Sequence, residues 1–127
     1  MHNSKPSYNT ELLFSPSFQE GLAILEKENV PLDLNIDLRT NPDILKHFVG
    51  IAERFPKLKM IIDHLGKPDV PKGQDYLEKW KADITEIAKH QNVYMKLSGM
   101  VVLAERWSRE LFQPYIDHSI QEFGVKR

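Results

Sequence analysis

The chain contains no cysteine among its 127 residues, so disulfide bonds and thiolate-ligated zinc sites are both excluded. It has no apolar run approaching the roughly 18 residues that a membrane-spanning helix needs, and its polar first fifteen residues contain no signal-peptide core. The net charge is only −1, with no basic stripe. These absences argue against membrane and nucleic-acid partners and make a cytoplasmic location the default expectation.

Several catalytic motifs are missing as well. The sequence contains no H-x-H, no H-E-x-x-H, no nucleophile elbow and no glycine-rich phosphate loop. It also has no pair of acidic residues at a spacing typical of acid–base catalysis. A self-contained metal site, a serine-type active site and a nucleotide-binding loop are therefore not expected.

What remains is the composition of one ordinary globular domain. Hydrophobic residues make up 41% and charged residues 28% of the chain, a balance typical of soluble domains. This length accommodates a single core. Residues 1–16 are mixed and polar, so we expect a loop or a frayed end there, and we expect residues 17–127 to form the domain.

Helix and strand signals alternate along residues 17–127. Helices are expected at residues 17–28, 42–55, 75–88 and 110–123, and strands at residues 30–37, 60–65 and 92–98. Ser17 opens a capping box, Asn41-Pro42 starts the second helix, Gly124 caps the last, and residues 101–107 predict a short helical segment. Strands recur about every 30 residues, the period of consecutive βαβ units, which predicts a parallel sheet in an α/β fold.

Two of the strands keep a polar face. In the first and third strands, polar residues alternate with apolar ones: Asp33, Asn35, Asp37, Tyr94, Lys96 and Ser98. A doubly wound sheet, covered by helices on both faces, has continuous apolar runs instead. A barrel strand packs against helices on one face and lines the barrel mouth with the other, and an edge strand gives a similar pattern. The balance favours a barrel.

The middle strand is the most informative part of the sequence. The apolar run that begins at Met60 ends in Asp63-His64-Leu65-Gly66-Lys67-Pro68. Gly66 and Pro68 stop any helix at this point, which leaves a buried strand. Its last side chains then lie at a strand's carboxyl end, where parallel α/β proteins place their chemistry.

His64 is the leading candidate for a catalytic residue. A structural interpretation is that its ring hydrogen-bonds a backbone carbonyl and fills the end of the sheet, which is the commoner role of a lone histidine. A functional interpretation is that it ligates a metal or polarises a substrate carbonyl. Asp63 is its strand neighbour and points to the opposite face, so we expect it to form a salt bridge or a backbone hydrogen bond.

Four further residues are candidates for substrate binding. Lys96 and Ser98 share a strand face and could hold an anionic or hydroxylated substrate. Asn35 and Asp37 follow the polar face of the first strand toward the same mouth. For Lys96 an equally good alternative is an ion pair with Asp33 or Asp37 across the mouth.

These motifs resemble a known family. The residues that carry the resemblance are D-H-L-G-K-P at residues 63–68, N-V-Y-M-K-L-S-G at residues 92–99, and Trp80 between them. F-Q-E-G-L at residues 18–22 and the tail from Pro114 to Arg127 fit the same pattern. Together they resemble the amidohydrolase-2 group, the branch of the amidohydrolase superfamily that includes sugar-lactone hydrolases and 2-pyrone-4,6-dicarboxylate lactonase. The likeness runs from about Ser17 to the end of the chain.

The resemblance implies a (β/α)8 barrel of about 250 residues, of which this chain would supply the fifth to seventh strands. It also implies lactone hydrolysis at the barrel mouth, with histidines or a divalent metal such as zinc polarising the ester carbonyl and an aspartate activating water. Of this catalytic set only His64 is carried over, because the H-x-H and the aspartate of the last strand have no counterpart here. His64 would bind a metal only if the missing strands were supplied.

We therefore expect a partial barrel from an amidohydrolase-type lactonase, inactive alone and with no cofactor of its own. A small-molecule lactone or carboxylate would be the substrate of the complete enzyme. One alternative is a non-catalytic α/β module that binds a partner through exposed sheet edges. Another is a truncated or split gene whose neighbouring sequence supplies the missing strands.

Overall fold

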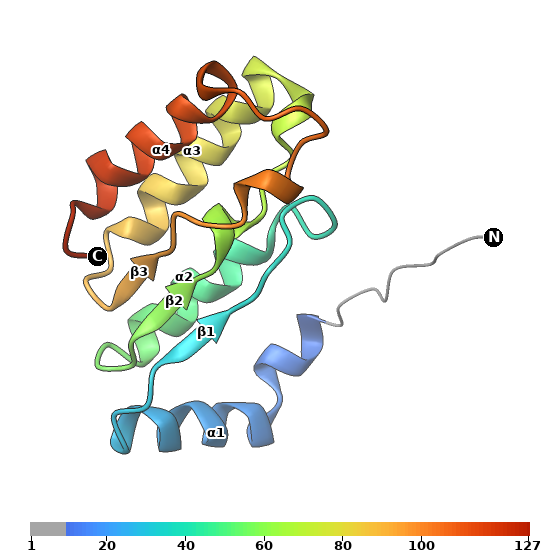
Figure 1. Ribbon diagram of the computed structural model, residues 1–127. Helices are drawn as coiled ribbons and strands as arrows, with labels where there is room; N and C mark the ends of the chain where they lie inside the picture. Colours follow the sequence, from blue (N-terminus) through green and yellow to red (C-terminus); the bar gives the residue numbers. More distant parts are fainter. Residues whose placement is uncertain (1–9) are drawn as a thin grey trace.

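The computed structural model describes residues 10–127 (Figure 1). Its helices are α1 (Pro16–Lys27), α2 (Ile44–Arg54), α3 (Gln74–Ala88) and α4 (Arg109–Phe123), and its strands are β1 (Leu32–Leu34), β2 (Met60–Ile62) and β3 (Val93–Met95). Short 3-10 helices are η1 (Thr10–Phe14), η2 (His64–Gly66), η3 (Val70–Lys72) and η4 (Met100–Val102). No helix in this part of the chain has the length and apolarity to cross a bilayer.

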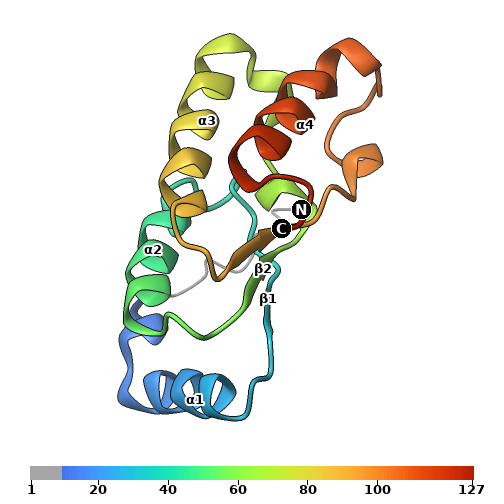
Figure 2. The ribbon, with the colours of Figure 1, turned by 90° about the vertical axis from the view of Figure 1, so that its left-hand side faces the viewer.

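The three strands form one parallel sheet in the order β1-β2-β3, as the strand spacing predicts. Leu32 pairs with Met60 and Met60 with Val93, so the strands are in step. Figures 1 and 2 show α2 and α3 along one face of this sheet, while no helix of residues 10–127 lies on the opposite face. Helix α4 packs beside α3.

The strands have one buried face and one open face. Leu34, Met60, Ile62 and Val93 are at most 3% exposed and point toward the helices. Ile61, midway between Met60 and Ile62, is only half-buried because its face of the sheet has no cover in the described chain. This is the two-sided pattern of a barrel strand, whose inner face meets other strands of the barrel.

All four predicted helix starts were within two residues of the observed ones, but the capping motifs expected for α1 and α2 were wrong. Helix α1 begins at Pro16, and the Ser15 hydroxyl accepts the cap hydrogen bond from the Phe18 amide at 3.3 Å, so Ser17 lies inside the helix. Pro16 fits the first helical position because its φ is fixed and it needs no amide partner. The expected loop over residues 1–16 contains η1 at Thr10–Phe14, and residues 1–9 lie outside the described part.

Helix α2 begins at Ile44 instead of Pro42. The preceding residues form a turn, in which the amides of Thr40 and Asn41 both donate to the Asp37 carbonyl, at 3.2 and 2.9 Å. This turn takes the place of the predicted asparagine cap. The strands are also shorter than predicted, and the helical segment expected at residues 101–107 is reduced to η4. The last helix ends at Phe123, and Gly124 caps it with a φ of 72°, as predicted.

Candidate functional site

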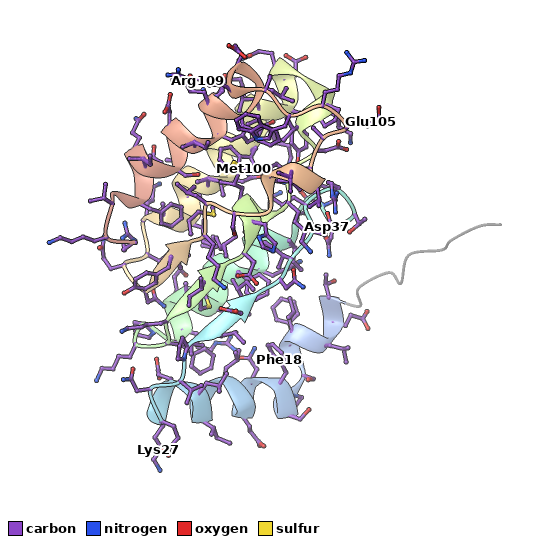
Figure 3. The ribbon with its side chains drawn as sticks, viewed as in Figure 1. Phe18, Lys27, Asp37, Met100, Glu105 and Arg109 are labelled. Carbon is purple, nitrogen blue, oxygen red and sulfur yellow. The ribbon has the colours of Figure 1, made fainter. Side chains whose placement is uncertain are left out.

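The predicted site residues lie beyond the carboxyl ends of the parallel strands. Figure 3 places Asp37 and Met100 past the ends of β1 and β3, at the same end of the sheet. The segment after β2 lies between them in the strand order and carries His64. Loops that leave the carboxyl ends of parallel strands are where barrel enzymes place their chemistry.

The His64 ring is held by the segment that follows β3. Its Nδ1 lies 2.8 Å from the Ser98 hydroxyl oxygen, a short hydrogen bond between residues 34 positions apart. A Cβ atom on Gly99 would lie 2.6 Å from the His64 Cγ, so only glycine fits beneath the ring. Gly99 also has a φ of 67°, which favours glycine. The ring position is therefore set by two consecutive residues.

The other ring nitrogen of His64 is free. Within residues 10–127, Nε2 forms no hydrogen bond, and it is not among the buried polar atoms that lack a partner. It is therefore open to solvent, whereas Nδ1 is occupied. A half-buried imidazole with one nitrogen pinned and the other free can donate to, or accept from, a bound molecule.

His64 sits on a strained turn. Four consecutive residues, His64 to Lys67, have positive φ values of 55°, 59°, 74° and 51°, although three of them are not glycine. Such residues cost free energy and persist where the surroundings hold them in place. Here the Leu65 amide donates to the Lys96 carbonyl at 3.2 Å, and the Leu65 carbonyl accepts from the Trp80 indole at 3.1 Å. Strain of this kind points to a constrained function.

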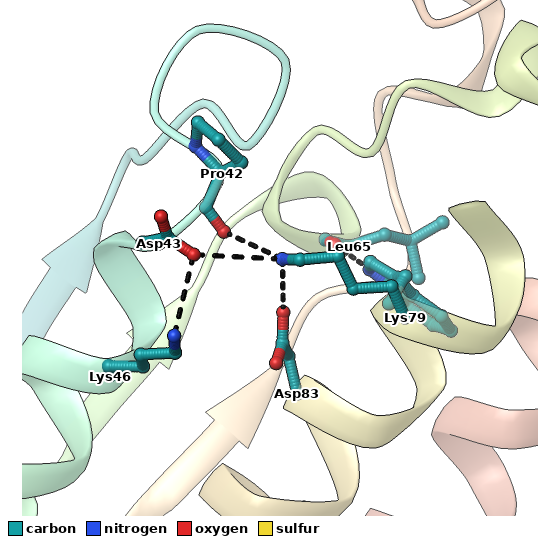
Figure 4. A network of polar contacts seen from close by, with 7 residues as sticks. Pro42, Asp43, Lys46, Leu65, Lys79 and Asp83 are labelled. Carbon is teal, nitrogen blue, oxygen red and sulfur yellow. Dashed lines mark hydrogen bonds and ion pairs between the residues drawn. The ribbon is translucent and has the colours of Figure 1, made fainter. Parts of the chain in front are cut away.

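Helix α3 supplies the support behind this turn (Figure 4). The Lys79 ammonium lies 2.9 Å from the Asp83 carboxylate and 3.3 Å from the Pro42 carbonyl, so it links α3 to the chain before α2. The hydrogen bond that the Lys79 ammonium donates to Asp83 raises the pKa of Lys79. Trp80, the next residue on α3, is 2% exposed and reaches Leu65. Lys79 and Trp80, neighbours on α3, thus hold the segment before α2 and the turn that carries His64.

Lys96 belongs to a second cluster. Its ammonium lies 2.8 Å from the Asp63 carboxylate and 3.2 Å from the Asp33 carboxylate. These hydrogen bonds, that to Asp63 first, raise the pKa of Lys96. The expected ion pair of Lys96 with Asp33 and the expected salt bridge of Asp63 are both confirmed. Lys96 and Ser98 therefore have different partners, an ion cluster and an imidazole.

Asn35 and Asp37 line a separate cavity. Asp37 accepts hydrogen bonds from the Arg39 Nε and Nη2 atoms, both at 2.9 Å, which raises the pKa of Arg39. Asn35 is exposed, and both residues border a mostly apolar cavity of about 390 Å³ between β1, η1 and α2. His64, Ser98 and Lys96 do not line it. The structure thus groups Ser98 with His64 and places Asn35 and Asp37 apart from them.

Sequence reasoning missed Gly99 and Trp80 as contributors to the site. Both residues belong to the motifs that resemble the amidohydrolase-2 group, but those motifs assign neither of them a contact with His64. No local pattern reveals their contacts with the His64 turn, because those contacts depend on how β2, β3 and α3 pack.

A metal site is not formed by the described residues alone. Among residues 10–127, no three histidine, cysteine, aspartate or glutamate side chains come together to hold an ion. His64 offers one nitrogen, and the neighbouring Asp63 carboxylate is already paired with Lys96. Tight zinc sites take at least three protein ligands. The residues at hand therefore do not fit a metal by themselves.

Comparison with known proteins gives this geometry a context. A family model described as amidohydrolase matches residues 2–127. The chain belongs to the amidohydrolase family. L-fucono-1,5-lactonase from Burkholderia ambifaria is 34% identical over 96 residues, which cover 75% of this chain and 32% of that protein. L-rhamnono-gamma-lactonase from Scheffersomyces stipitis is 33% identical over 93 residues, 66% of this chain and 27% of that protein.

Solved amidohydrolase structures match the fold. An amidohydrolase from Burkholderia multivorans with bound zinc has a TM-score of 0.79 at 23% identity, covering 95% of this chain and 43% of that one. Amidohydrolase 2 from Bifidobacterium longum subsp. infantis has a TM-score of 0.63 at 25% identity, covering 94% and 41%. The expected fold is confirmed: this amidohydrolase chain forms a three-stranded part of a TIM barrel. It spans about a third of the length of the curated relatives it matches.

Proposed function

We propose that this chain forms part of the catalytic mouth of an amidohydrolase that hydrolyses a lactone. The observation that carries the proposal is the His64 imidazole, pinned at Nδ1 by Ser98 and free at Nε2 beyond the carboxyl ends of parallel strands. The relatives from Burkholderia ambifaria and Scheffersomyces stipitis are both lactonases, which suggests a lactone as the substrate class.

In this proposal His64 polarises the ester carbonyl of the lactone. A hydrogen bond from Nε2 to the carbonyl oxygen stabilises the negative charge that develops when water attacks the carbonyl carbon. The bond between the carbonyl carbon and the ring oxygen then breaks, the ring oxygen receives the proton taken from water, and the lactone becomes a hydroxy acid. The base that takes the proton from water is assigned to other strands of the barrel. No step is assigned to a metal, because the described residues do not form a metal site.

Asn35, Asp37 and Lys96 have supporting roles in this proposal. Asn35 has an exposed amide that can hydrogen-bond the hydroxyl groups of a sugar lactone. Asp37 lines the cavity next to Asn35 and accepts two hydrogen bonds from Arg39. Lys96 holds Asp63 and Asp33 near the mouth, and a substrate carboxylate would compete with them for its ammonium.

The first test uses the chain by itself. We expect the purified protein to show no hydrolysis of L-fucono-1,5-lactone above the spontaneous rate, with or without added zinc, since the described residues contain one histidine of the site and no metal cluster. Release of acid, followed with a pH indicator, measures the rate. Zinc-dependent turnover by this chain would contradict the proposal that other strands are required.

The second test completes the barrel. Residues 17–127 would replace the matching segment of the Burkholderia ambifaria lactonase, to which the chain is 34% identical. We expect the chimera to hydrolyse the lactone and the His64→Gln change to lower kcat/KM by roughly a hundredfold or more, since it removes a transition-state donor. His90→Gln, two residues beyond the carboxyl end of α3, is the matched control. Equal activity of the two variants would refute a role for His64.

A second candidate function is binding of another polypeptide at the sheet edges. The outer edge of β3 borders a groove of about 250 Å³ whose lining includes Met95, Leu97 and Val125, and Leu97 and Val125 are 41% and 91% exposed. Part of this edge is covered, because the Met95 amide donates to the Arg127 carbonyl at 2.8 Å. Two results together would favour this function. The isolated chain would be a monodisperse monomer that melts cooperatively, and the chimera would show no lactone hydrolysis.

A further inference from the structure

The hydrogen bond between His64 and Ser98 can have two directions, and the direction decides what Nε2 offers at the mouth. If the Ser98 hydroxyl donates to Nδ1, the ring hydrogen sits on Nε2, which then donates to a ligand. If Nδ1 donates to Ser98, Nε2 presents a lone pair, as a metal ligand or a base requires. The 2.8 Å contact itself fits either direction.

The surroundings favour donation by Ser98. His64 Nδ1 is the single hydrogen-bond partner of the Ser98 hydroxyl within residues 10–127, and Ser98 is half-buried. If the hydroxyl accepted from Nδ1, its own hydrogen would have no partner among the described residues. Donation to Nδ1 uses that hydrogen and leaves the remaining N–H of the ring on the nitrogen that solvent reaches.

Gly99 makes Ser98 the partner on which the state of Nδ1 depends. A Cβ atom on this residue would lie 2.7 Å from Nδ1 and 2.6 Å from Cγ of His64, so the Gly99 backbone packs closely against that side of the ring. Close packing of this kind leaves little room for a water molecule to replace Ser98 at Nδ1. The state of Nδ1 then depends on Ser98.

We propose that Ser98 is a positioning residue that locks His64 in the tautomer with its hydrogen on Nε2, so that the mouth presents a neutral N–H donor to an uncharged carbonyl oxygen. This inference rests on the proposed function and deepens it. It assigns His64 to carbonyl polarisation by a hydrogen bond, and it assigns the Ser98 hydroxyl to the ring instead of the substrate.

The test reads the tautomer of His64 directly in the full chain. Long-range ¹H–¹⁵N correlation spectra of labelled protein, recorded at a pH where histidines are neutral, distinguish the two tautomers, and His64→Gln identifies the His64 signals. His118 is an internal standard, because its Nε2 lies 3.0 Å from the Lys81 carbonyl oxygen, which only accepts. We expect His64 to show the same Nε2–H pattern as His118.

Variants of Ser98 then show whether this residue is the cause. Loss of one hydrogen bond in Ser98→Ala should shift the tautomer ratio of His64 roughly fivefold toward Nδ1–H, and Ser98→Thr should restore it. Thr85→Ala is the matched control, because Thr85 lies 3.1 Å from the His118 Nε2 and does not contact His64. Far-UV circular dichroism confirms folding, and Ser98→Cys, a weaker donor, replaces Ser98→Ala if the latter does not fold.

Two outcomes would overturn the proposal. One is an Nδ1–H pattern for His64 in the unchanged chain. That tautomer would leave a lone pair on Nε2, which could bind a metal or accept a proton instead of donating to a carbonyl. The other is an Nε2–H pattern that Ser98→Ala or Ser98→Cys leaves unaltered. Neither measurement involves turnover, so an inactive chimera with the expected tautomer would refute lactone hydrolysis and leave the role of Ser98 in place.

Discussion

His64 and His118 are two partly buried histidines that each contact a hydroxyl group through one ring nitrogen, but the two rings lie in different parts of the fold. The His118 Nε2 lies near both the Thr85 hydroxyl and the Lys81 carbonyl, so it ties α4 to α3. The His64 ring uses only Nδ1 and keeps Nε2 open at the strand ends. A histidine whose hydrogen-bonded nitrogen joins two helices serves stability, and one with an open nitrogen on a strained turn beyond the strand ends is a candidate for chemistry.

Replacement of Trp80 should have the largest effect on stability, because its side chain contacts both the turn that carries His64 and the His118 ring. Its indole donates to Leu65 next to His64, and its ring centroid lies 5.8 Å from that of His118. Trp80→Ala should lower the free energy of unfolding by about 3–5 kcal/mol, the usual cost of removing a buried aromatic side chain. Urea denaturation measures this. Trp107, 56% exposed, is the control, and a similar loss in Trp107→Ala would contradict the special place of Trp80.

Gly99→Ala should affect His64 and leave His118 unchanged. The new Cβ would lie 2.6 Å from the His64 ring on a residue whose φ is 67°, so we expect a loss of about 2 kcal/mol in the free energy of unfolding. NMR signals of the His64 ring should move while those of His118 stay. Gly21→Ala has open space within α1 and should instead stabilise the chain slightly. An unmoved His64 signal would show that Gly99 does not position the ring.

Replacing each histidine sharpens the contrast. His118→Ala should cost about 1–2 kcal/mol, because it removes the hydrogen bond to the Lys81 carbonyl and leaves that oxygen without this partner. His64→Ala should cost less, since the His64 ring has a single hydrogen-bond partner within residues 10–127, the Ser98 hydroxyl, whereas the His118 Nε2 contacts two groups. Paired urea titrations compare the two variants. A larger loss for His64→Ala would make its role structural.

Tyr115 gives the smallest expected effect and a dependence on pH. Its hydroxyl is buried without a partner among the described residues, so Tyr115→Phe should stabilise the chain by up to about 1 kcal/mol. Burial raises the pKa of Tyr115 to about 12, above the ordinary value of 10.0. The unfolded chain therefore loses this proton first, and stability should fall as the pH rises from 10 to 12. That part of the decline should be absent in Tyr115→Phe.

Much of the fold follows from sequence patterns. The recurrence of strands about every 30 residues predicts the parallel sheet, and the polar faces of the first and third strands predict that helices cover only one face, because burial on one side produces alternation. The helix starts were harder to place. Ser15-Pro16 and Ser17 are both reasonable starts, and the tertiary structure selects the first.

The site was predictable only in part. His64 is identified by its place after an apolar run and before Gly66. Its bond to Ser98 depends on the register of β2 against β3 and on a left-handed turn of four residues, neither of which local propensity specifies. The partner of Lys96 was also undecided by the sequence, which allowed either a substrate or an aspartate. The strand order in the folded chain brings Asp33 and Asp63 to the Lys96 ammonium.

The Lys96 cluster also has a mechanical consequence. Asp33 belongs to β1, Asp63 follows β2 and Lys96 follows β3, so one ammonium group fastens all three strands at the mouth. It resists sliding of one strand past another at that end only. Because salt screens exposed charges, high ionic strength should loosen this fastening and leave the apolar, helix-covered side unchanged.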